Sequence, residues 1–374
     1  MKIVLAPDKF KNSLTGLEFC SAVKAGIHAV DPGVTIVNLP LADGGDGTIE
    51  VVNYYLKGEV IHVTVNNPFF EPIQASYLFS KEERTAFIEM AEASGVKLLK
   101  PEQFDCKNAT TLGTGEMIID AINRGASKII LGIGGSATND CGVGMATALG
   151  YRFLDKHNNE VLPVGANLSK IESIDVSNVH PELFNVSFRI ACDVTNPLFG
   201  EHGAACVYAA QKGASPEDIK LLDEGLEAFS EVINAVFNID VQAVPGAGAA
   251  GGMGIASKVF LKGVLEPGVQ LIKHLAQFDS KLENADWIIT GEGKLDSQTL
   301  SGKTIEGVAN SARIKNIKVA AFCGMIDLDE KALKAFGIEY SDAVLNHSKD
   351  LEDAMKNGYD YLKRMAFNFV KEVR

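Results

Sequence analysis

Glycine-rich and acidic loops that follow short apolar runs are the feature that most limits the folds open to this chain. Five runs rich in β-branched or small apolar residues each lead into such a loop or turn, and a helical pattern follows. This order is typical of a parallel β-sheet whose strands are joined by helices. Ligands of such sheets bind outside the carboxyl ends of the strands, where these loops would lie. The expected strands are residues 2–5, 34–41, 128–131, 287–290 and 318–322.

The middle of the chain has a different pattern. Residues 59–65, 73–79 and 85–90 are close-spaced strand patterns joined by turns, which predicts an antiparallel meander. Residues 216–237 favour two helices. Near the N-terminus, Thr15 with Glu18 three residues later predicts a capping box at the start of the first helix.

A length of 374 residues predicts two domains, because one hydrophobic core would be crowded at this size. We expect an α/β fold with two α/β domains. Residues 1–50 and 265–374 would form a Rossmann- or flavodoxin-like parallel sheet, and residues 51–264 a second α/β domain inserted in the middle of the chain. The active site is expected in the cleft between them.

The charge balance excludes several classes of protein. The chain has 35 Lys and Arg against 48 Asp and Glu, a net charge of −13 without a basic cluster, so we expect no binding to nucleic acid or to an anionic membrane. No signal-peptide core and no apolar run of about 18 residues is present. Six scattered cysteines lack the spacing of a zinc site. These observations indicate a globular cytoplasmic protein with reduced cysteines.

Two glycine motifs raise the question of a dinucleotide cofactor. Residues 246–251 match G-x-G-x-x-G, and residues 132–137 match its G/A variant after a strand. The second motif lacks an acidic residue about 20 positions further on to hold a ribose. Residues 297–304 are a near miss for a Walker A loop, because Ser297 stands where its first glycine belongs. Glycine loops still expose backbone N–H groups that suit phosphate.

Acidic residues also gather at the expected strand ends. Each could simply cap a helix or brace a turn. Together they predict a site for phosphoryl transfer, which needs oxygen ligands for Mg²⁺, cations or N–H groups for the phosphoryl, and a carboxylate to accept a proton. The residues are Asp8, Asp43, Asp46, Asp140, Asp193, Glu292 and Asp296.

The ordered set of loops resembles the bacterial type 1 glycerate kinases. The matching stretches are residues 6–15, 43–48, 132–140, 193–200, 246–252 and 291–296. Cys141 and Ile305 depart from the expected pattern, but neither replaces a carboxylate or a lysine. The resemblance implies phosphorylation of D-glycerate by ATP with Mg²⁺, at either the 2- or the 3-hydroxyl. It leaves the oligomeric state open, a homodimer included.

We assign site residues by chemistry within these loops. Asp193 is the expected general base with Asp296 as the alternative, and Lys9 is the catalytic cation. The expected substrate-binding residues are Asp8, Ser13, Asp43, Asp46 and Asn196. The expected ATP-binding residues are Gly134, Gly135, Ser136, Asn139, Gly248, Gly251, Gly252, Lys294 and Lys303. The expected Mg²⁺ ligands are Asp43, Asp46 and Glu292.

Two other classes of function stay open from the sequence. The G-x-G patterns would suit a nicotinamide-dependent oxidoreductase of a small hydroxy acid. A two-domain cleft would suit a noncatalytic protein that binds an organic acid. Glycerate-dependent release of ADP distinguishes a kinase from both.

Overall fold

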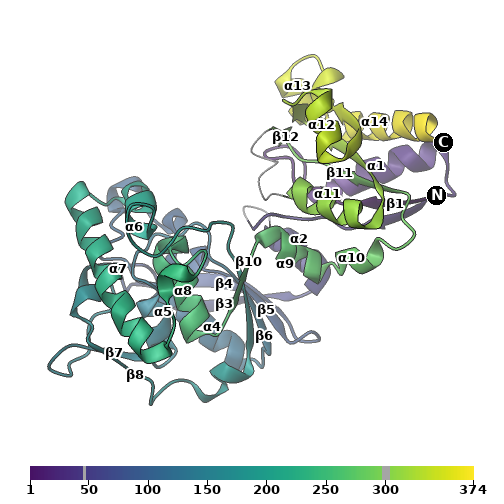
Figure 1. The fold of residues 1–374 in the computed structure, drawn as a ribbon. Helices are drawn as coiled ribbons and strands as arrows, with labels where there is room; N and C mark the ends of the chain where they lie inside the picture. The colour runs from purple at the N-terminus through teal and green to yellow at the C-terminus, as the bar shows by residue number, and fades with distance from the viewer. Residues whose placement is uncertain (45–47, 297–303) are drawn as a thin grey trace. The chain divides into compact units, whose positions relative to one another are not determined.

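The computed structural model describes residues 1–44, 48–296 and 304–374. The chain divides into two compact units (Figure 1). Unit 1 consists of Met1–Tyr55 and Pro267–Arg374, and unit 2 of Leu56–Glu266. Each unit has a β-sheet of its own with helices packed around it, so the fold is α/β.

Unit 1 is built on a five-stranded parallel sheet in the order β15-β13-β11-β1-β2. Counted along the chain, this order is 2-1-3-4-5, as in flavodoxin-like folds. Its central strands are almost continuously apolar because helices cover both faces of such a sheet. The strands are β1 (Lys2–Leu5), β2 (Thr35–Asn38), β11 (Trp287–Thr290), β13 (Lys318–Cys323) and β15 (Ile338–Ala343).

Local sequence signals explain how the first helix, α1 (Gly16–Val30), begins and packs. Thr15 Oγ1 accepts from the N–H of Glu18 at 3.1 Å, and Glu18 Oε2 accepts from the N–H of Thr15 at 2.8 Å, which confirms the predicted capping box. Such a cap stabilises a helix by about 1 kcal/mol. At Gly26, a Cβ would lie 2.1 Å from the carbonyl oxygen of Lys363 on α14 (Gly358–Val373), so glycine permits the two helices to approach closely.

The remaining elements of unit 1 are shorter. Two two-residue strands, β12 (Lys294–Leu295) and β14 (Met325–Ile326), pair in parallel just beyond β11 and β13. The helices are α2 (Thr48–Leu56), α9 (Gly268–Leu275), α10 (Phe278–Lys281), α11 (Thr304–Lys315), α12 (Glu330–Phe336) and α13 (Leu351–Lys356), with a 3₁₀ turn at Val344–Asn346.

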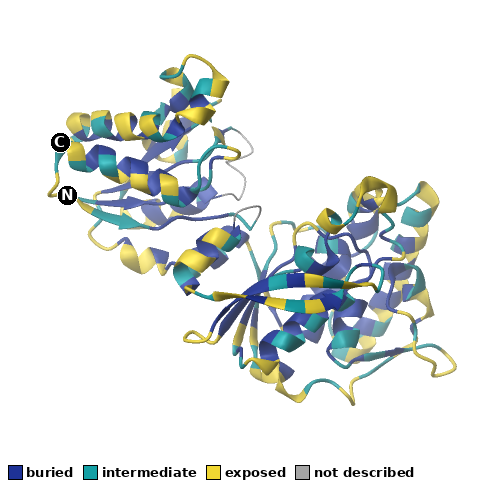
Figure 2. Cartoon of the chain, turned by 180° about the vertical axis from the view of Figure 1, so that it is seen from behind, coloured by how far each residue is buried: buried dark blue, intermediate teal, exposed yellow. Residues whose placement is uncertain are grey.

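Unit 2 has a six-stranded mixed sheet in the order β10-β9-β6-β5-β4-β3. The strands β3, β4 and β5 are antiparallel, as the meander pattern predicted, and the other neighbours are parallel. Figure 2 shows buried strands in both units and exposed outer faces on many helices. The strands are β3 (Glu59–Asn66), β4 (Pro72–Ser80), β5 (Thr85–Glu89), β6 (Lys128–Gly132), β9 (Ser187–Ala191) and β10 (Val264–Glu266).

The segment expected to form two helices is the single helix α7 (Pro216–Phe237), so that prediction was wrong. Ser215 and Asp218 form a capping box at its start. Gly225 does not interrupt the helix. This glycine is buried against Leu168, and a Cβ at its position would lie 3.4 Å from the Cβ of Leu168.

The other elements of unit 2 surround the sheet or form a small hairpin. The helices are α3 (Ala91–Ser94), α4 (Leu112–Asn123), α5 (Val143–Ala148), α6 (Ala204–Tyr208) and α8 (Ala249–Phe260). A two-stranded antiparallel pair joins β7 (Arg152–Leu154) to β8 (Ser173–Asp175). The 3₁₀ turns are Val96–Leu98, Pro101–Gln103, Gly165–Lys170, Pro181–Asn185, Ala210–Lys212 and Val241–Ala243. Within the described ranges, no helix is both long enough and apolar enough to cross a bilayer.

Candidate active site

The topological switch point of unit 1 lies between β1 and β11, and Asp8 follows β1 there. The N–H of Asp8 donates to the carbonyl of Gly291, which follows β11, at 2.8 Å. At Gly291, a Cβ would lie 1.8 Å from the carbonyl oxygen of Phe322, so only glycine fits this crossing. In doubly wound sheets, this position is where ligands bind.

The Asp8 carboxylate accepts two hydrogen bonds. It accepts from its neighbour's N–H, that of Lys9, at 2.7 Å and from the hydroxyl of Thr304, at the start of α11, at 2.5 Å. Partial burial raises the pKa of Asp8 to about 6, and the nearby carboxylate of Asp43 adds to the rise. Two carboxylates therefore repel one another at the switch point.

A cavity of about 370 Å³ opens beside this pair within unit 1. Asp8, Lys9 and Ser13 line one part of it, and Glu50 lines another. The Ser13 hydroxyl donates to the carbonyl of Met355 at 2.8 Å, so while that bond is made it can only accept from a ligand. The cavity is large enough for a small organic acid.

Lys294 and Asp296, which were assigned separate roles, form an ion pair with one another. Lys294 Nζ lies 3.1 Å from Asp296 Oδ2 and 3.4 Å from Asp327 Oδ2, and these carboxylates raise the pKa of the lysine. The same lysine lies on β12, so its backbone is fixed by pairing with β14. An Asp296 carboxylate held by a lysine is a weaker base than one without a cationic partner.

In unit 2, the loop after β6 exposes backbone N–H groups. Gly134 and Gly135 are exposed, and Gly135 has a φ of +69°. Within the described residues, the backbone N–H groups of Gly134, Gly135 and Ser136 donate no hydrogen bond to another group of the chain. Such groups form a concavity that suits an anion.

The far end of this loop is anchored by Asp140, which is fully buried. Its carboxylate accepts from the N–H and hydroxyl of Thr111 at 2.8 and 2.7 Å, and from the N–H groups of Gly142 and Gly144, each at 3.2 Å. Burial raises the pKa of Asp140, and these four donors oppose the rise. Asp140 is therefore committed to holding the chain. In contrast, the buried Nδ2 of Asn139 makes no hydrogen bond within the described chain.

The glycine run in α8 packs directly on this loop. Ala250, Gly251 and Gly252 have positive φ angles of 52°, 72° and 93°, which form a left-handed turn inside the helix. At Gly251, a Cβ would lie 2.3 Å from the carbonyl oxygen of Thr138. The N–H groups of Gly248 and Gly252 donate to backbone carbonyls at 3.1 and 3.4 Å. Those two glycines therefore serve packing, and their N–H groups are already engaged.

The predicted base, Asp193, lies in an exposed loop after β9. Nearby Asn196 is engaged on both sides of its amide: Nδ2 donates to the carbonyl of His202 at 2.9 Å, and Oδ1 accepts from Tyr208 at 2.6 Å. The backbone carbonyl of Asn196 accepts from Gly248 at 3.1 Å, which ties the Asp193 loop to the glycine run. Three of the predicted loops thus meet within unit 2.

Two assigned residues, Asp46 and Lys303, lie outside the described residues. Within residues 1–44, 48–296 and 304–374, no group of three or more His, Cys, Asp or Glu is arranged to hold a metal ion. The other assigned residues are divided between the two units. Those of unit 1 are Asp8, Lys9, Ser13, Asp43, Glu292, Lys294 and Asp296. Those of unit 2 are Gly134, Gly135, Ser136, Asn139, Asp193, Asn196, Gly248, Gly251 and Gly252.

Two residues at these sites were missed from sequence. Lys212 is buried in unit 2, and its Nζ donates to Ser136 Oγ at 2.6 Å and to the carbonyl of Thr138 at 2.9 Å. It is the only charged residue in the small and apolar run 203–214, a signal that could have drawn attention to it. Thr304 is the last residue of the sequence that nearly matches a Walker A loop, but no local pattern links it to Asp8.

Unit 1 has a flavodoxin-like switch point with carboxylates and a lysine, and unit 2 has a glycine loop with unused N–H groups, features that suit a kinase of small molecules. The comparisons with known proteins support the same class and narrow it. The sequence model of the Glycerate kinase family matches residues 3–374, so the chain belongs to the glycerate kinase family. The oxidoreductase and noncatalytic alternatives find no support in these comparisons.

Similar proteins cover essentially the whole chain. It is 41% identical to a "Glycerate 2-kinase" of Escherichia coli K12, over 98% of this chain and 97% of the relative. It is 40% identical to a "Glycerate kinase" of Bacillus subtilis 168, over 100% and 98%. A crystal structure from Salmonella typhimurium LT2, assigned as glycerate kinase 2, matches with a TM-score of 0.89 and 40% identity, over 100% of this chain and 98% of that one.

Proposed function

We propose that the protein transfers the terminal phosphoryl group of ATP to the 2-hydroxyl of D-glycerate, which yields ADP and 2-phosphoglycerate. Family membership supports the reaction class. The name of the Escherichia coli relative, a glycerate 2-kinase, supports the 2-hydroxyl over the 3-hydroxyl. The observation that carries the proposal is the partly buried Asp8 carboxylate, next to Lys9 in the wall of a small cavity at the switch point of unit 1.

Asp8 is the general base that this arrangement favours. In the reaction, the glycerate hydroxyl oxygen attacks the terminal phosphorus, the bond from that phosphorus to the bridging oxygen breaks, and ADP leaves with the bond's electrons. The hydroxyl proton passes to a carboxylate. Asp8 shares its cavity with Lys9, whereas Asp193 is exposed and Asp296 is paired with a lysine.

Lys9 supplies the cation for the glycerate carboxylate or for the transferred phosphoryl group. Its backbone N–H is already bonded to Asp8, which fixes the lysine at the end of β1. Ser13 lines the same cavity and would accept a hydrogen bond from a glycerate hydroxyl, because its own proton is directed to Met355.

The residues present fit Mg²⁺. Mg²⁺ in kinases is usually held by one or two carboxylates together with substrate phosphates. Asp43 places a carboxylate near enough to raise the pKa of Asp8, and a divalent cation would relieve that repulsion. Asp43 and Glu292 would hold the ion. When bound, Mg²⁺ neutralises charge on the phosphate oxygens.

The loop after β6 would bind an anionic group of a substrate, with ATP phosphates as the first candidate. Gly134, Gly135 and Ser136 offer N–H groups that the chain itself does not use. A cytoplasmic location is part of the proposal, because all six cysteines are free thiols, as is usual in a reducing compartment.

The test is an assay of ADP release with and without D-glycerate, followed by phosphorus NMR of the product. We expect ADP release that requires D-glycerate and a product phosphorylated at carbon 2. Release of ADP that is independent of glycerate would overturn the activity. A product phosphorylated at carbon 3 would overturn only the choice of hydroxyl.

A further inference from the structure

Lys212 is a buried cation that the reaction described above does not use. It ends the 3₁₀ turn Ala210–Lys212 and is 5% exposed. Its ammonium donates to Ser136 Oγ at 2.6 Å and to the carbonyl of Thr138 at 2.9 Å. Both acceptors belong to the loop that exposes Gly134 and Gly135, which directly precede Ser136.

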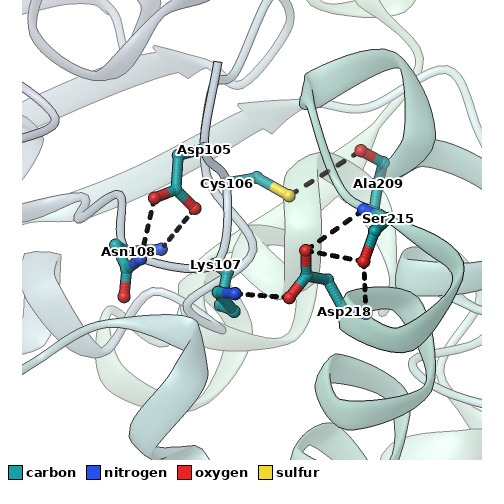
Figure 3. Close-up of polar contacts among 7 residues, drawn as sticks. All are labelled: Asp105, Cys106, Lys107, Asn108, Ala209, Ser215 and Asp218. Atoms are coloured by element: carbon teal, nitrogen blue, oxygen red, sulfur yellow. Dashed lines mark hydrogen bonds and ion pairs between the residues drawn. The ribbon is translucent and has the colours of Figure 1, made fainter. Parts of the chain in front are cut away.

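The backbone carbonyl of Lys212 accepts from Cys106, and Figure 3 shows further contacts of Cys106 and its neighbours that do not involve the Lys212 ammonium. Lys107 and Asp218 form an ion pair, and Cys106 Sγ donates to the carbonyl of Ala209 at 3.7 Å. The N–H of Cys106 also donates to the carbonyl of Lys212 at 3.2 Å. Removing the charge from Lys212 should therefore leave its backbone in place.

Gly213 fixes the turn from the other side. It has a φ of +92°, and a Cβ there would lie 2.1 Å from the carbonyl oxygen of Phe104. The turn that places Lys212 in the interior therefore requires glycine at position 213.

The charge of Lys212 is not cancelled by a direct ion pair within the described parts of the chain. Asp140 and Cys106 are the titratable groups that face it. The Asp140 carboxylate is engaged by four donors of its own, and burial raises the pKa of the Cys106 thiol to about 11, so it is neutral. A positive charge consequently lies behind a loop that presents unused N–H groups to solvent.

We propose that Lys212 is a positioning residue for the anion-binding loop: by holding Ser136 and Thr138, it aims the N–H groups of Gly134 and Gly135 at a phosphate or carboxylate of the substrates. This inference rests on the proposed function. The ammonium binds the loop and not the substrate, so its role is exerted through the loop.

A matched control is available in unit 1. Lys273 is 6% exposed, and its Nζ donates to Ser311 Oγ at 2.7 Å and to the carbonyl of Gly307 at 3.2 Å. It therefore has similar burial and two hydrogen-bond acceptors of the same kinds as Lys212, and it also lies 3.9 Å from Asp279 Oδ1. Within the described chain, its hydrogen bonds go to the helix α11 and not to a glycine loop. Lys273→Met measures the cost of losing a buried, hydrogen-bonded ammonium in general.

The experiment compares Lys212→Met with Lys273→Met by steady-state kinetics, with ATP and D-glycerate varied separately. We expect Lys212→Met to raise the KM of the substrate held by the loop about tenfold or more, and Lys273→Met to leave both KM values within twofold. A rise for ATP assigns the loop to phosphate, and a rise for D-glycerate assigns it to carboxylate. Unchanged KM values in Lys212→Met would overturn the proposal.

A pH profile separates positioning from simple loss of stability. Burial lowers the pKa of Lys212 to about 8, with Cys106 and Asp140 opposing the shift. The lysine is therefore charged below about pH 8 and loses its charge above it. We expect kcat/KM of the unaltered protein to fall as pH rises through 8, Lys273→Met to keep this fall, and Lys212→Met to lack it. An identical alkaline limb in Lys212→Met would contradict the inference.

Two further measurements keep the result interpretable. If Lys212→Met does not fold, Ser136→Ala keeps the lysine but removes one of its two contacts with the loop, and we expect a smaller rise in the same KM. If the unaltered protein shows no glycerate-dependent ADP release, the proposed function fails. Calorimetric binding of ATP and of D-glycerate to the same variants then still tests the loop, and binding to Lys212→Met equal to that of the unaltered protein would overturn the role of Lys212.

Discussion

The hydroxyl of Thr304 donates to Asp8 Oδ2 at 2.5 Å, across 296 positions of sequence. This bond joins the first turn of α11 to the end of β1. It lowers the pKa of Asp8, whereas burial and Asp43 raise it. The orientation of the proposed base is thus set by a residue from the far end of the chain.

Asp8→Asn tests the base directly. The amide keeps the shape and one acceptor oxygen, which can accept from Thr304 or from the N–H of Lys9 but not from both. It cannot take a proton, so we expect kcat to fall about 10²- to 10⁴-fold. Asp193→Asn is the matched control, and we expect it to retain most of the activity because Asp193 is exposed. Steady-state kinetics measure both.

The same variants distinguish a base from a metal ligand. If Asp8 accepts the proton, the Mg²⁺ concentration for half-maximal activity should stay within about threefold in Asp8→Asn. A much larger Mg²⁺ requirement would move Asp8 into the metal site. A severe loss in Asp193→Asn with Asp8→Asn still active would restore Asp193 as the base.

Thr304→Val tests whether the hydrogen bond to Asp8 matters for turnover. Valine has the shape of threonine without the hydroxyl, and a hydrogen bond to a charged group contributes about 1.5–3 kcal/mol. We expect kcat to fall about tenfold or more. Thr304→Ser, which keeps the hydroxyl, should stay within about threefold of the unaltered protein. Equal kcat values for the valine and serine variants would show that the bond is dispensable.

Local patterns were sufficient to predict most strands of the two sheets and the start of α1, but the strands β10 and β15 were not predicted. The Thr15–Glu18 box spans three residues, and each strand-to-loop transition lies within about ten, so neighbouring sequence determines them. The segment 216–237 was predicted as two helices, and its continuous course through Gly225, which packs against Leu168, was not evident from the sequence pattern.

Side-chain partners at the site could not be predicted in the same way. Asp140 was a candidate acid by its position, yet four donors, two of them from Thr111, commit it to anchoring a loop. Lys212 reaches Ser136 across 76 positions. These contacts depend on how distant segments pack, and no spacing in the sequence encodes that.

Gly251→Ala tests the close packing of the two glycine loops in unit 2. Gly251 has a φ of +72°, so an alanine at this position would carry left-handed backbone strain. The close approach adds to this strain, because a Cβ at 251 would lie 2.3 Å from the carbonyl oxygen of Thr138. Left-handed strain of about 1–2 kcal/mol and overpacking of about 1–3 kcal/mol predict a loss of about 3 kcal/mol.

Gly125→Ala is the control for this prediction. Gly125 has a φ of +93°, but a Cβ there would meet nothing within 4 Å, so it carries only the backbone strain. We expect the melting temperature of unit 2 to fall by roughly 6–12 °C for Gly251→Ala and by about 2–8 °C for Gly125→Ala. Equal shifts would show that the contact with Thr138 relaxes at little cost.

Asp353 on α13 makes unit 1 sensitive to acid. Its carboxylate accepts from the N–H of Lys349 at 3.0 Å, from Tyr361 at 2.7 Å and from Asn357 at 2.6 Å, and these bonds lower its pKa to about 2. In the unfolded chain, the pKa of this carboxyl would be about 3.9. The stabilisation is therefore complete above about pH 4 and is lost as pH falls through about 2.

We expect the melting temperature to fall less steeply between pH 4 and 2 in Asp353→Asn than in the unaltered protein. Glu352→Gln removes a carboxylate of the same helix that makes no hydrogen bond or ion pair within the described chain, so it should keep the original slope. Parallel slopes for all three proteins would show that Asp353 does not set the acid limit of unit 1.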